Sequence, residues 1–375
     1  MSRPHFTPLV ERLPATIPFI SPEQQQRALG RPFSARLGAN ENVFGPSPRA
    51  RAAMAEALPD CWMYADAEHR ELREALAAKH GVPFENIVVG EGVDGLLGLL
   101  ARVLVAEGTP VVTSNGAYPT FNYHVASFGG RLVRVPYRDD HEDPDGLLAA
   151  AAREAAPLVY LANPDNPMGT WWPASKIETM VAQMPSDSVL CLDEAYIEFA
   201  PEGTAPDIDP EDPRVVRMRT FSKAYGMAGM RVGYAIATTR MIQAFNKVKN
   251  HFGMNRIGLV GAAASVEDQA WIPQIRAQVA AARDRIAEIA AKNGLSALPS
   301  ATNFVAVDCG RDGEFAKAVL SALIERGVFV RMPFVEPENR CIRVSAGTPE
   351  MLDAFETALP QALAEAAAAR ETARA

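Results

Sequence analysis

Short hydrophobic runs alternate with segments of helical periodicity through the middle of the chain. The runs are rich in β-branched residues and lie at residues 87–89, 110–113, 132–135, 158–161, 189–193, 215–220 and 232–237. This alternation is typical of a mostly parallel sheet whose two faces are both covered by helices. The pattern therefore predicts an α/β fold for this part of the chain.

The pattern changes after Lys247. Residues 256–293 are rich in alanine and predict one or two long helices. They are followed by predicted strands near 304–308, 328–331 and 341–345, a helix at 313–326 and a final helix from Pro349. The last residues have helix propensity without an apolar stripe, so we expect them to fray. The second half therefore predicts a smaller α+β domain.

The beginning of the chain has neither pattern. Residues 1–46 are rich in proline and predict an arm, whereas Ser47-Pro48 is typical of a helix start and predicts a helix to about Leu58. A second helix, 67–80, is expected to end at Gly81. The expected organisation is an N-terminal arm (1–46), a large domain (47–255) and a small C-terminal domain (256–375).

Composition and charge narrow the class of protein. The 375 residues are 48% hydrophobic and carry a formal net charge of -8, an acidic balance that argues against nucleic-acid binding. No run approaches the roughly 18 apolar residues of a membrane span, and the N-terminus lacks the apolar core of a signal peptide. The cysteines form no C-x-x-C pair, so no metal site or disulfide framework is indicated. We expect a cytoplasmic protein with reduced thiols.

A glycine-rich segment, Gly90-Glu91-Gly92-Val93-Asp94-Gly95, follows a predicted strand and opens a helix. Taken literally it is the G-x-G-x-x-G fingerprint of dinucleotide binding. The next strand, however, ends without the acidic residue that holds the ribose of NAD. Because exposed amides at a helix N-terminus bind phosphate in either case, the segment favours a phosphate-containing ligand. NAD and a purely structural turn remain the alternatives.

Two polar segments follow apolar strands, at the edge where open α/β sheets bind ligands. Residues 163–170 carry Asn166 between two X-Pro units, and they form either a rigid ligand-binding loop or a surface turn. Asp193 comes directly after a very apolar strand, where a carboxylate is costly unless it is paired. Asp193 therefore caps a helix or meets a permanent cation, such as a protonated pyridine nitrogen.

A lysine follows a third apolar strand. Lys223 lies next to Ser222, close to Thr220 and eight residues before Arg231. A desolvated lysine near another positive charge suits imine formation, and hydroxyls with an arginine suit a phosphate. Lysines more commonly lie on solvated faces, so the position of Lys223 at a strand end favours chemistry.

These segments, in this order, resemble the fold-type I pyridoxal-phosphate (PLP) aminotransferases and, within them, the histidinol-phosphate aminotransferase family. The resemblance extends from about Leu37 to Thr348, and LGANENVFGPSP at residues 37–48 is similar to that family's N-terminal signature. It implies an aspartate aminotransferase-like fold with PLP bound in the large domain.

The resemblance also implies a role for each site residue. Lys223 would form an aldimine with PLP and move a proton between Cα and C4′, while Asp193 would pair with the pyridinium nitrogen. Asn166 and Tyr196 would hold the ring hydroxyl oxygen, and Tyr118 would stack on the ring. The cofactor phosphate would be bound by Gly92, Val93, Thr220, Ser222, Arg231 and, across a homodimer, the partner subunit's Tyr64. Asn40, Arg331 and Arg343 would bind the substrate.

The chain departs from the family's pattern near the phosphates. Val93 and Gly95 replace the serine and glutamate of the usual phosphate loop, and Ala65 replaces a proline. Phe19 stands where the family has a tyrosine that binds the phosphate of histidinol phosphate. Arg331 does match the arginine that faces this phosphate.

The expected function is therefore amino transfer from histidinol phosphate to 2-oxoglutarate, a step of histidine biosynthesis, without a metal. An aromatic or other amino acid as donor, and a PLP-dependent amino-acid-phosphate decarboxylase, are the alternatives. An NAD-dependent oxidoreductase is a remote one. The expected partners are an amino donor, a 2-oxo acid and a second copy of the chain, with no nucleic acid and no membrane.

Overall fold

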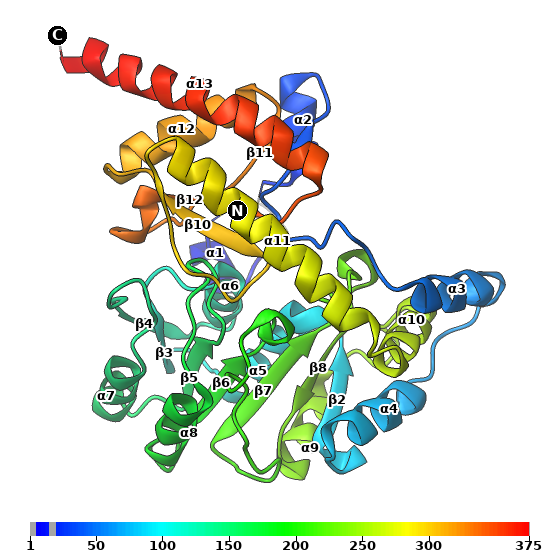
Figure 1. Cartoon of the computed structure of the whole chain (residues 1–375). Coiled ribbons are helices and arrows are strands. Elements are labelled where there is room, and N and C mark those ends of the chain that lie inside the picture. The colour runs from blue at the N-terminus through cyan, green and yellow to red at the C-terminus, as the bar shows by residue number, and fades with distance from the viewer. Residues whose placement is uncertain (1–4, 15–19, 375) are drawn as a thin grey trace.

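A seven-stranded sheet forms the larger part of the molecule, with helices packed on both of its faces (Figure 1). The structure is a computed structural model and describes residues 5–14 and 20–374. The strand order is β2-β8-β7-β6-β5-β3-β4. All neighbouring pairs from β7 to β4 are parallel, and only β8 runs antiparallel to its neighbours β7 and β2. The predicted mostly parallel α/β sheet is confirmed.

The strands of this sheet coincide with the predicted apolar runs. They are β2 (Ile87–Gly90), β3 (Pro110–Ser114), β4 (Arg131–Val135), β5 (Leu158–Ala162), β6 (Val189–Asp193), β7 (Val215–Thr220) and β8 (Gly233–Ile236). The helices around them are α3 (Pro48–Ala57), α4 (Arg70–His80), α5 (Gly92–Leu104), α6 (Pro119–Ser127), α7 (Pro144–Glu154), α8 (Ala174–Ala182), α9 (Thr239–Val248) and α10 (Arg256–Glu267). The helix expected from residue 67 begins at Arg70, because His69 has a left-handed backbone with φ of 51°.

The side chains of β5 illustrate why both faces are covered. Leu158 and Tyr160 belong to an apolar cluster with residues of α5 and α6, whereas Val159 and Leu161 belong to another with residues of α7 and α8. Successive side chains of a strand point to opposite faces, so a strand that is apolar throughout needs helices on both sides. All five residues of β5 are buried.

A second, smaller sheet stands beside the first. It has the antiparallel order β12-β10-β9 and comprises β9 (Ser296–Ala297), β10 (Phe304–Asp308) and β12 (Cys341–Ser345). Its helices are α11 (Trp271–Lys292), α12 (Gly313–Glu325) and α13 (Pro349–Arg374). One apolar cluster is continuous between the two sheets, since it contains Tyr234 of β8 and Phe355 of α13. The predicted α+β composition of this part is confirmed.

The N-terminal arm is tied to the smaller sheet region. It contains α1 (Pro8–Arg12), α2 (Pro22–Leu29) and β1 (Ala35–Arg36), and β1 pairs in parallel with β11 (Val328–Phe329). The chain then crosses to α3, beside the large sheet (Figure 1). Among the described residues, no helix combines the length and the apolar character needed to cross a bilayer.

The expectation that the C-terminal tail lacks an apolar stripe is wrong, and its predicted helix, α13, continues to Arg374. Leu359, Ala362 and Ala366 are buried and lie three and four residues apart, on one face of the helix. Alanines therefore provide the apolar stripe that the sequence did not reveal, because a small side chain is enough where α13 packs closely on its neighbours.

Gly226 lies where the loop that carries Lys223 meets the arm. Its φ is 68°, and a Cβ built there would overlap the carbonyl group of Gly45. In contrast, a Cβ at Gly229 in the same loop meets no atom within 4 Å. Gly226 thus permits the close approach that brings the arm to the lysine loop.

We expect Gly226→Ala to destabilise the fold by about 2–4 kcal/mol, since both the left-handed backbone and the overlap disfavour a Cβ. Gly229→Ala is the matched control and should change the free energy of unfolding by less than about 1 kcal/mol. Urea unfolding of both variants tests this expectation, and equal midpoints for the two would contradict it.

Candidate active site

The carboxyl ends of the parallel strands β5, β6 and β7 open into a cavity of about 660 Å³. Nearly all the predicted site residues line it, although they come from the arm, the large sheet and the smaller sheet. They are Asn40, Val93, Tyr118, Asn166, Asp193, Tyr196, Thr220, Ser222, Lys223, Arg231, Arg331 and Arg343. Gly92 is next to Val93, at the start of α5.

Asp193 is a buried carboxylate without a cationic partner in the described part of the chain. It is 4% exposed and accepts hydrogen bonds from the hydroxyl of Tyr160 (2.8 Å) and the amide of Ala195 (3.0 Å). Burial raises the pKa of Asp193 to about 6, and the two hydrogen bonds only partly offset this effect. The helix-cap alternative is excluded because neither acceptor atom binds a helix N-terminus, which leaves a cation from outside the chain as the alternative.

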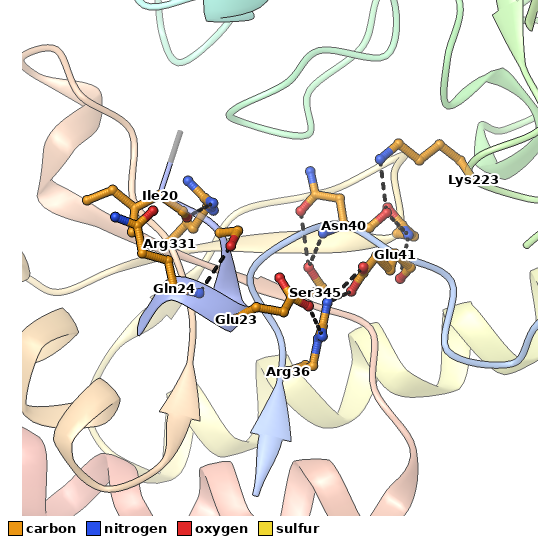
Figure 2. A network of polar contacts seen from close by, with 11 residues as sticks. Ile20, Glu23, Gln24, Arg36, Asn40, Glu41, Lys223, Arg331 and Ser345 are labelled. Carbon is orange, nitrogen blue, oxygen red and sulfur yellow. Dashed lines mark hydrogen bonds and ion pairs between the residues drawn. The ribbon is translucent and has the colours of Figure 1, made fainter. Parts of the chain in front are cut away.

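Lys223 lies in the same cavity. Its Nζ donates to the backbone carbonyl of Asn40 (3.0 Å; Figure 2). The same atom is 5.4 Å from the ring centre of Tyr196. The amine is thus held by one neutral acceptor from the arm rather than by a carboxylate. An amine without a carboxylate partner remains available to react with a carbonyl group.

The turn before α5 forms an anion cradle with Arg231. Gly92 has φ of 74°, and a Cβ built there would lie 2.6 Å from Nη2 of Arg231. Nη1 of Arg231 donates to the hydroxyl of Ser222 (3.3 Å), which also accepts from Thr220 (3.0 Å). Amides at a helix N-terminus, a guanidinium and hydroxyls together suit a phosphate.

Tyr118, at the start of α6, faces this cradle from the other side. Its hydroxyl donates to Oδ1 of Asp94 (2.7 Å), and Oδ2 of Asp94 lies 3.6 Å from Arg231. Burial is the main cause that raises the pKa of Tyr118 well above its usual value. This tyrosine is therefore a neutral, fixed ring at the wall of the cavity.

The loop after β5 holds Asn166 rigidly. Asn163 exchanges two hydrogen bonds with the backbone of Trp172 (2.8 and 3.0 Å), and Oδ2 of Asp165 accepts from the amide of Met168 (2.9 Å). The surface-turn alternative for this segment is wrong, since Asn163 and Asp165 are buried. The side-chain oxygen of Asn166 accepts from Arg343, so its amide nitrogen is the donor that remains.

Two arginines stand side by side at the other end of the cavity. Arg331 and Arg343 exchange backbone hydrogen bonds (3.2 and 2.6 Å), so their side chains lie on the same face of the chain pair. Burial lowers the pKa of Arg343 to about 10, and its buried Nε has no hydrogen-bond partner among the described residues. Arg331 also donates to the carbonyl of Ile20 in the arm (2.8 Å; Figure 2).

Other predictions fall outside the cavity. Tyr64 is exposed and stacks obliquely on Phe252, with ring centres 5.1 Å apart, and is not part of the cavity of its own chain. Phe19 lies in residues 15–19, outside the described part of the chain. The NAD alternative is wrong, because β2 lies beside β8 and not beside β3, so β2, α5 and β3 do not form the βαβ unit of adjacent parallel strands that the fingerprint requires.

Sequence reasoning missed several residues that contact the predicted ones. Tyr160 hydrogen-bonds to Asp193, Asp94 to Tyr118, and Ser345 to Asn40. Asp94 and Ser345 stand in segments that the sequence singled out, at the glycine-rich turn and two residues after Arg343. Tyr160 carries a detectable signal too, as a hydroxyl in a strand that is otherwise apolar.

Fold and site together define an enzyme of the class that binds an aldehyde cofactor through a lysine. A protonated pyridine nitrogen fits the unpaired Asp193, and a phosphate fits the cradle at Gly92 and Arg231, so the residues present suit PLP. The chain belongs to the class I and II aminotransferases, a PLP-dependent family whose pattern matches residues 35–359.

The most similar proteins found are more narrowly defined. A histidinol-phosphate aminotransferase of Sinorhizobium meliloti, solved in complex with pyridoxal 5′-phosphate, is 51% identical with a TM-score of 0.94, over 97% of this chain and 98% of that one. Histidinol-phosphate aminotransferase 2 of Ralstonia nicotianae is 37% identical over 89% of this chain and 90% of its own length. That of Moorella thermoacetica is 33% identical over 91% and 89%. The resemblance read from the motifs is confirmed.

We expect Asp193→Asn to have opposite effects on stability and on cofactor binding. In the cofactor-free protein, the raised pKa makes the folded state bind a proton more tightly than the unfolded state. The free energy of unfolding therefore falls as pH rises from about 4 to 6, and Asn removes this loss. The variant should be more stable by about 1–3 kcal/mol at pH 8 and no more stable below about pH 4.

The same variant should bind PLP at least roughly tenfold more weakly, because the cationic ring loses its counter-ion. Urea unfolding at both pH values and equilibrium dialysis with PLP measure the two effects. Lower stability of the cofactor-free variant at pH 8 would contradict the assignment of Asp193 as an unpaired charge.

Proposed function

We propose that the chain transfers the amino group of histidinol phosphate to 2-oxoglutarate, with PLP as cofactor. The observation that carries this proposal is the pair Arg331 and Arg343, two guanidinium groups on one face at the substrate end of the cavity. The names of the similar proteins support the same donor. Amino-acid biosynthesis, and the histidine pathway in particular, follows as the proposed role.

The charges of both substrates fit this pair. Histidinol phosphate has no carboxylate but carries a phosphate monoester with a charge between -1.5 and -2, on the basis of a second pKa of about 6. 2-Oxoglutarate carries two carboxylates. Each substrate therefore presents close to two negative charges on its oxygens, and planar guanidinium groups bind phosphate and carboxylate oxygens bidentately. With 2-oxoglutarate, Arg343 would bind the carboxylate next to the 2-oxo carbon and Arg331 the second carboxylate. With histidinol phosphate, Arg331 would bind the phosphate oxygens.

PLP, when bound, supplies an aldehyde carbon and an electron-withdrawing ring that stabilises negative charge at Cα. Asp193 would keep the ring nitrogen protonated, and Tyr118 would stack on the ring. Asn166 and Tyr196 would donate to the ring oxygen. The phosphate would be bound by Gly92, Val93, Thr220, Ser222 and Arg231.

Lys223 would have two tasks. Its Nζ would hold the cofactor by a covalent bond and, once the substrate amine has displaced it, would move a proton between Cα and C4′. The contact of Nζ with the carbonyl of Asn40 supports this, because a weak neutral acceptor leaves the amine free to turn toward either atom. Asn40 would close the substrate side of the cavity from the arm.

The exposed aromatic residues around Tyr64 support a homodimer. Leu58, Trp62, Tyr64 and Phe252 are all exposed, with relative exposures from 56% to 80%. Contiguous exposed apolar side chains of this kind mark protein contacts. We propose that the phosphate cradle is completed by the partner subunit's Tyr64.

We also propose that the chain divides into an arm (1–46), a large domain (47–255) and a small domain (256–375).

We also propose a cytoplasmic location. The four cysteines are unpaired and three of them are buried, as is usual for a protein of a reducing compartment.

We expect histidinol phosphate to bleach the visible absorption of the PLP-loaded protein at lower concentrations than phenylalanine or glutamate. Addition of 2-oxoglutarate should restore the band. Lys223→Ala should abolish turnover, by about four orders of magnitude or more, whereas the exposed Lys247→Ala should not. Bleaching by phenylalanine alone would identify a different donor, and release of carbon dioxide from an amino-acid phosphate would identify a decarboxylase.

A mixture of two variants tests the shared site. The Lys223→Ala protein should be inactive, and the Tyr64→Ala protein should be only weakly active at limiting PLP. Their heterodimer contains one site with an intact Lys223 and an intact Tyr64, so the co-expressed pair should be more active than both separate proteins together. A heterodimer without this gain, or a native mass equal to the 40.5 kDa of one chain, would contradict the proposal.

A further inference from the structure

Asn40 has an unusual backbone and an unusually complete set of contacts. It is a buried residue with φ of 54°, in the left-handed region that non-glycine residues rarely occupy. Its carbonyl accepts from Lys223 (3.0 Å) and from the side chain of Asn303 (3.1 Å). Such a conformation persists only where its surroundings hold it, and it concentrates at functional sites.

One hydroxyl makes two of these contacts. The Oγ atom of Ser345, the last residue of β12, accepts from the backbone amide of Asn40 (3.1 Å) and donates to its side-chain oxygen (3.0 Å; Figure 2). Ser345 is 2% exposed, so water does not compete for these bonds. The donated proton determines the orientation of the Asn40 amide, since only the oxygen end can accept it.

The nitrogen end of the amide therefore faces Tyr196. Nδ2 of Asn40 donates to the Tyr196 hydroxyl at 3.0 Å. Because the phenolic oxygen accepts from this side, its own proton must point elsewhere, and no acceptor among the described residues takes it. Tyr196 lines the cavity, so that proton is available to an acceptor inside it.

We propose that Ser345 is a positioning residue which, through Asn40, fixes Tyr196 as a hydrogen-bond donor toward the cavity. The acceptor is the ring oxygen of PLP, so this inference rests on the proposed cofactor site. Three donors in a row, from Ser345 to Asn40 to Tyr196, strengthen each other by polarisation. Ser345, a residue of the smaller sheet, thereby affects the charge distribution in a cofactor bound at the larger sheet.

The charged groups around Tyr196 come from other elements. Lys223 lies 5.4 Å from its ring centre, and Arg343 of β12 is near enough for electrostatic coupling. The neutral Tyr118, directly before α6, is another titratable group nearby. Asp193 is three residues before Tyr196 and accepts a hydrogen bond from the amide of Ala195. Of these groups, only Arg343 lies on the same face of β12 as Ser345. A displacement of Arg343 in the Ser345→Ala variant must therefore be measured separately.

The pH midpoint of the visible absorbance change in the PLP-loaded protein reports the chain of donors. A hydrogen bond donated to the ring oxygen of PLP weakens the attraction of that oxygen for the proton on the nitrogen that Lys223 contributes. The pKa of this nitrogen is therefore lower when the donor is present. We expect Ser345→Ala to raise the midpoint by roughly 0.3–1 pH unit, the effect of weakening one hydrogen bond. Ser345→Thr keeps the hydroxyl and should restore the native midpoint.

The decisive control is Tyr196→Phe. Because Ser345 acts through Tyr196, adding Ser345→Ala to Tyr196→Phe should leave the midpoint of the single Phe variant unchanged. The KM for 2-oxoglutarate should stay within about threefold of native in Ser345→Ala, since Arg343 keeps its place. If Ser345→Ala folds poorly, Asn40→Gly suits the left-handed backbone, removes the amide and should also raise the midpoint.

The outcomes separate this inference from the proposed function. An unchanged midpoint in both Ser345→Ala and Asn40→Gly, or an equal shift with and without Tyr196, overturns the positioning role. A native protein with no visible band in the presence of PLP overturns the cofactor site itself.

Discussion

The carboxylate of Asp193 is buried, and only two groups of the described residues donate hydrogen bonds to it, the hydroxyl of Tyr160 and the amide of Ala195. A charge so placed destabilises the protein alone and becomes favourable only beside a cation. The other parts of the site would place a cationic ring beside this carboxylate. In the proposed site Lys223 would provide the covalent bond and the Gly92 turn would hold the phosphate, and the position of the ring between them would follow from Asp193.

The sheet topology explains why these groups meet. Parallel strands end at one edge, so Asn166, which follows β5, meets Asp193 and Thr220, the last residues of β6 and β7, there. The antiparallel strand β8 then returns from the same edge, and a single loop carries both Lys223 and Arg231. A Cβ at Gly233 would lie 2.8 Å from the backbone of Gly92, so the start of β8 is held directly against the phosphate turn.

Much of this could be predicted from the sequence, because strand ends are local features. Lys223 and Asp193 stand out as charges directly after apolar strands, and the apolar runs gave the large sheet strand by strand. The final helix was predicted, but the buried stripe of its tail was missed, since alanines form it. The contacts of Ser345 with Asn40 join positions 305 residues apart, and no local pattern reports such a pair. The substrate arginines were identified by resemblance rather than by spacing.

The pairing of β1 with β11 determines how late in synthesis the N-terminal arm can fold. Ser34 binds the carbonyl of Gly327, so the arm finds its partner only 293 residues later. A ribosome synthesises the chain from the N-terminus, and the large sheet is complete well before β11 leaves it. Until then β1 has no strand to pair with, and the cavity lacks the wall that Arg331 and Arg343 form. The first segment to be synthesised is therefore among the last to take its place, and a newly made chain acquires its catalytic site only at the end of translation.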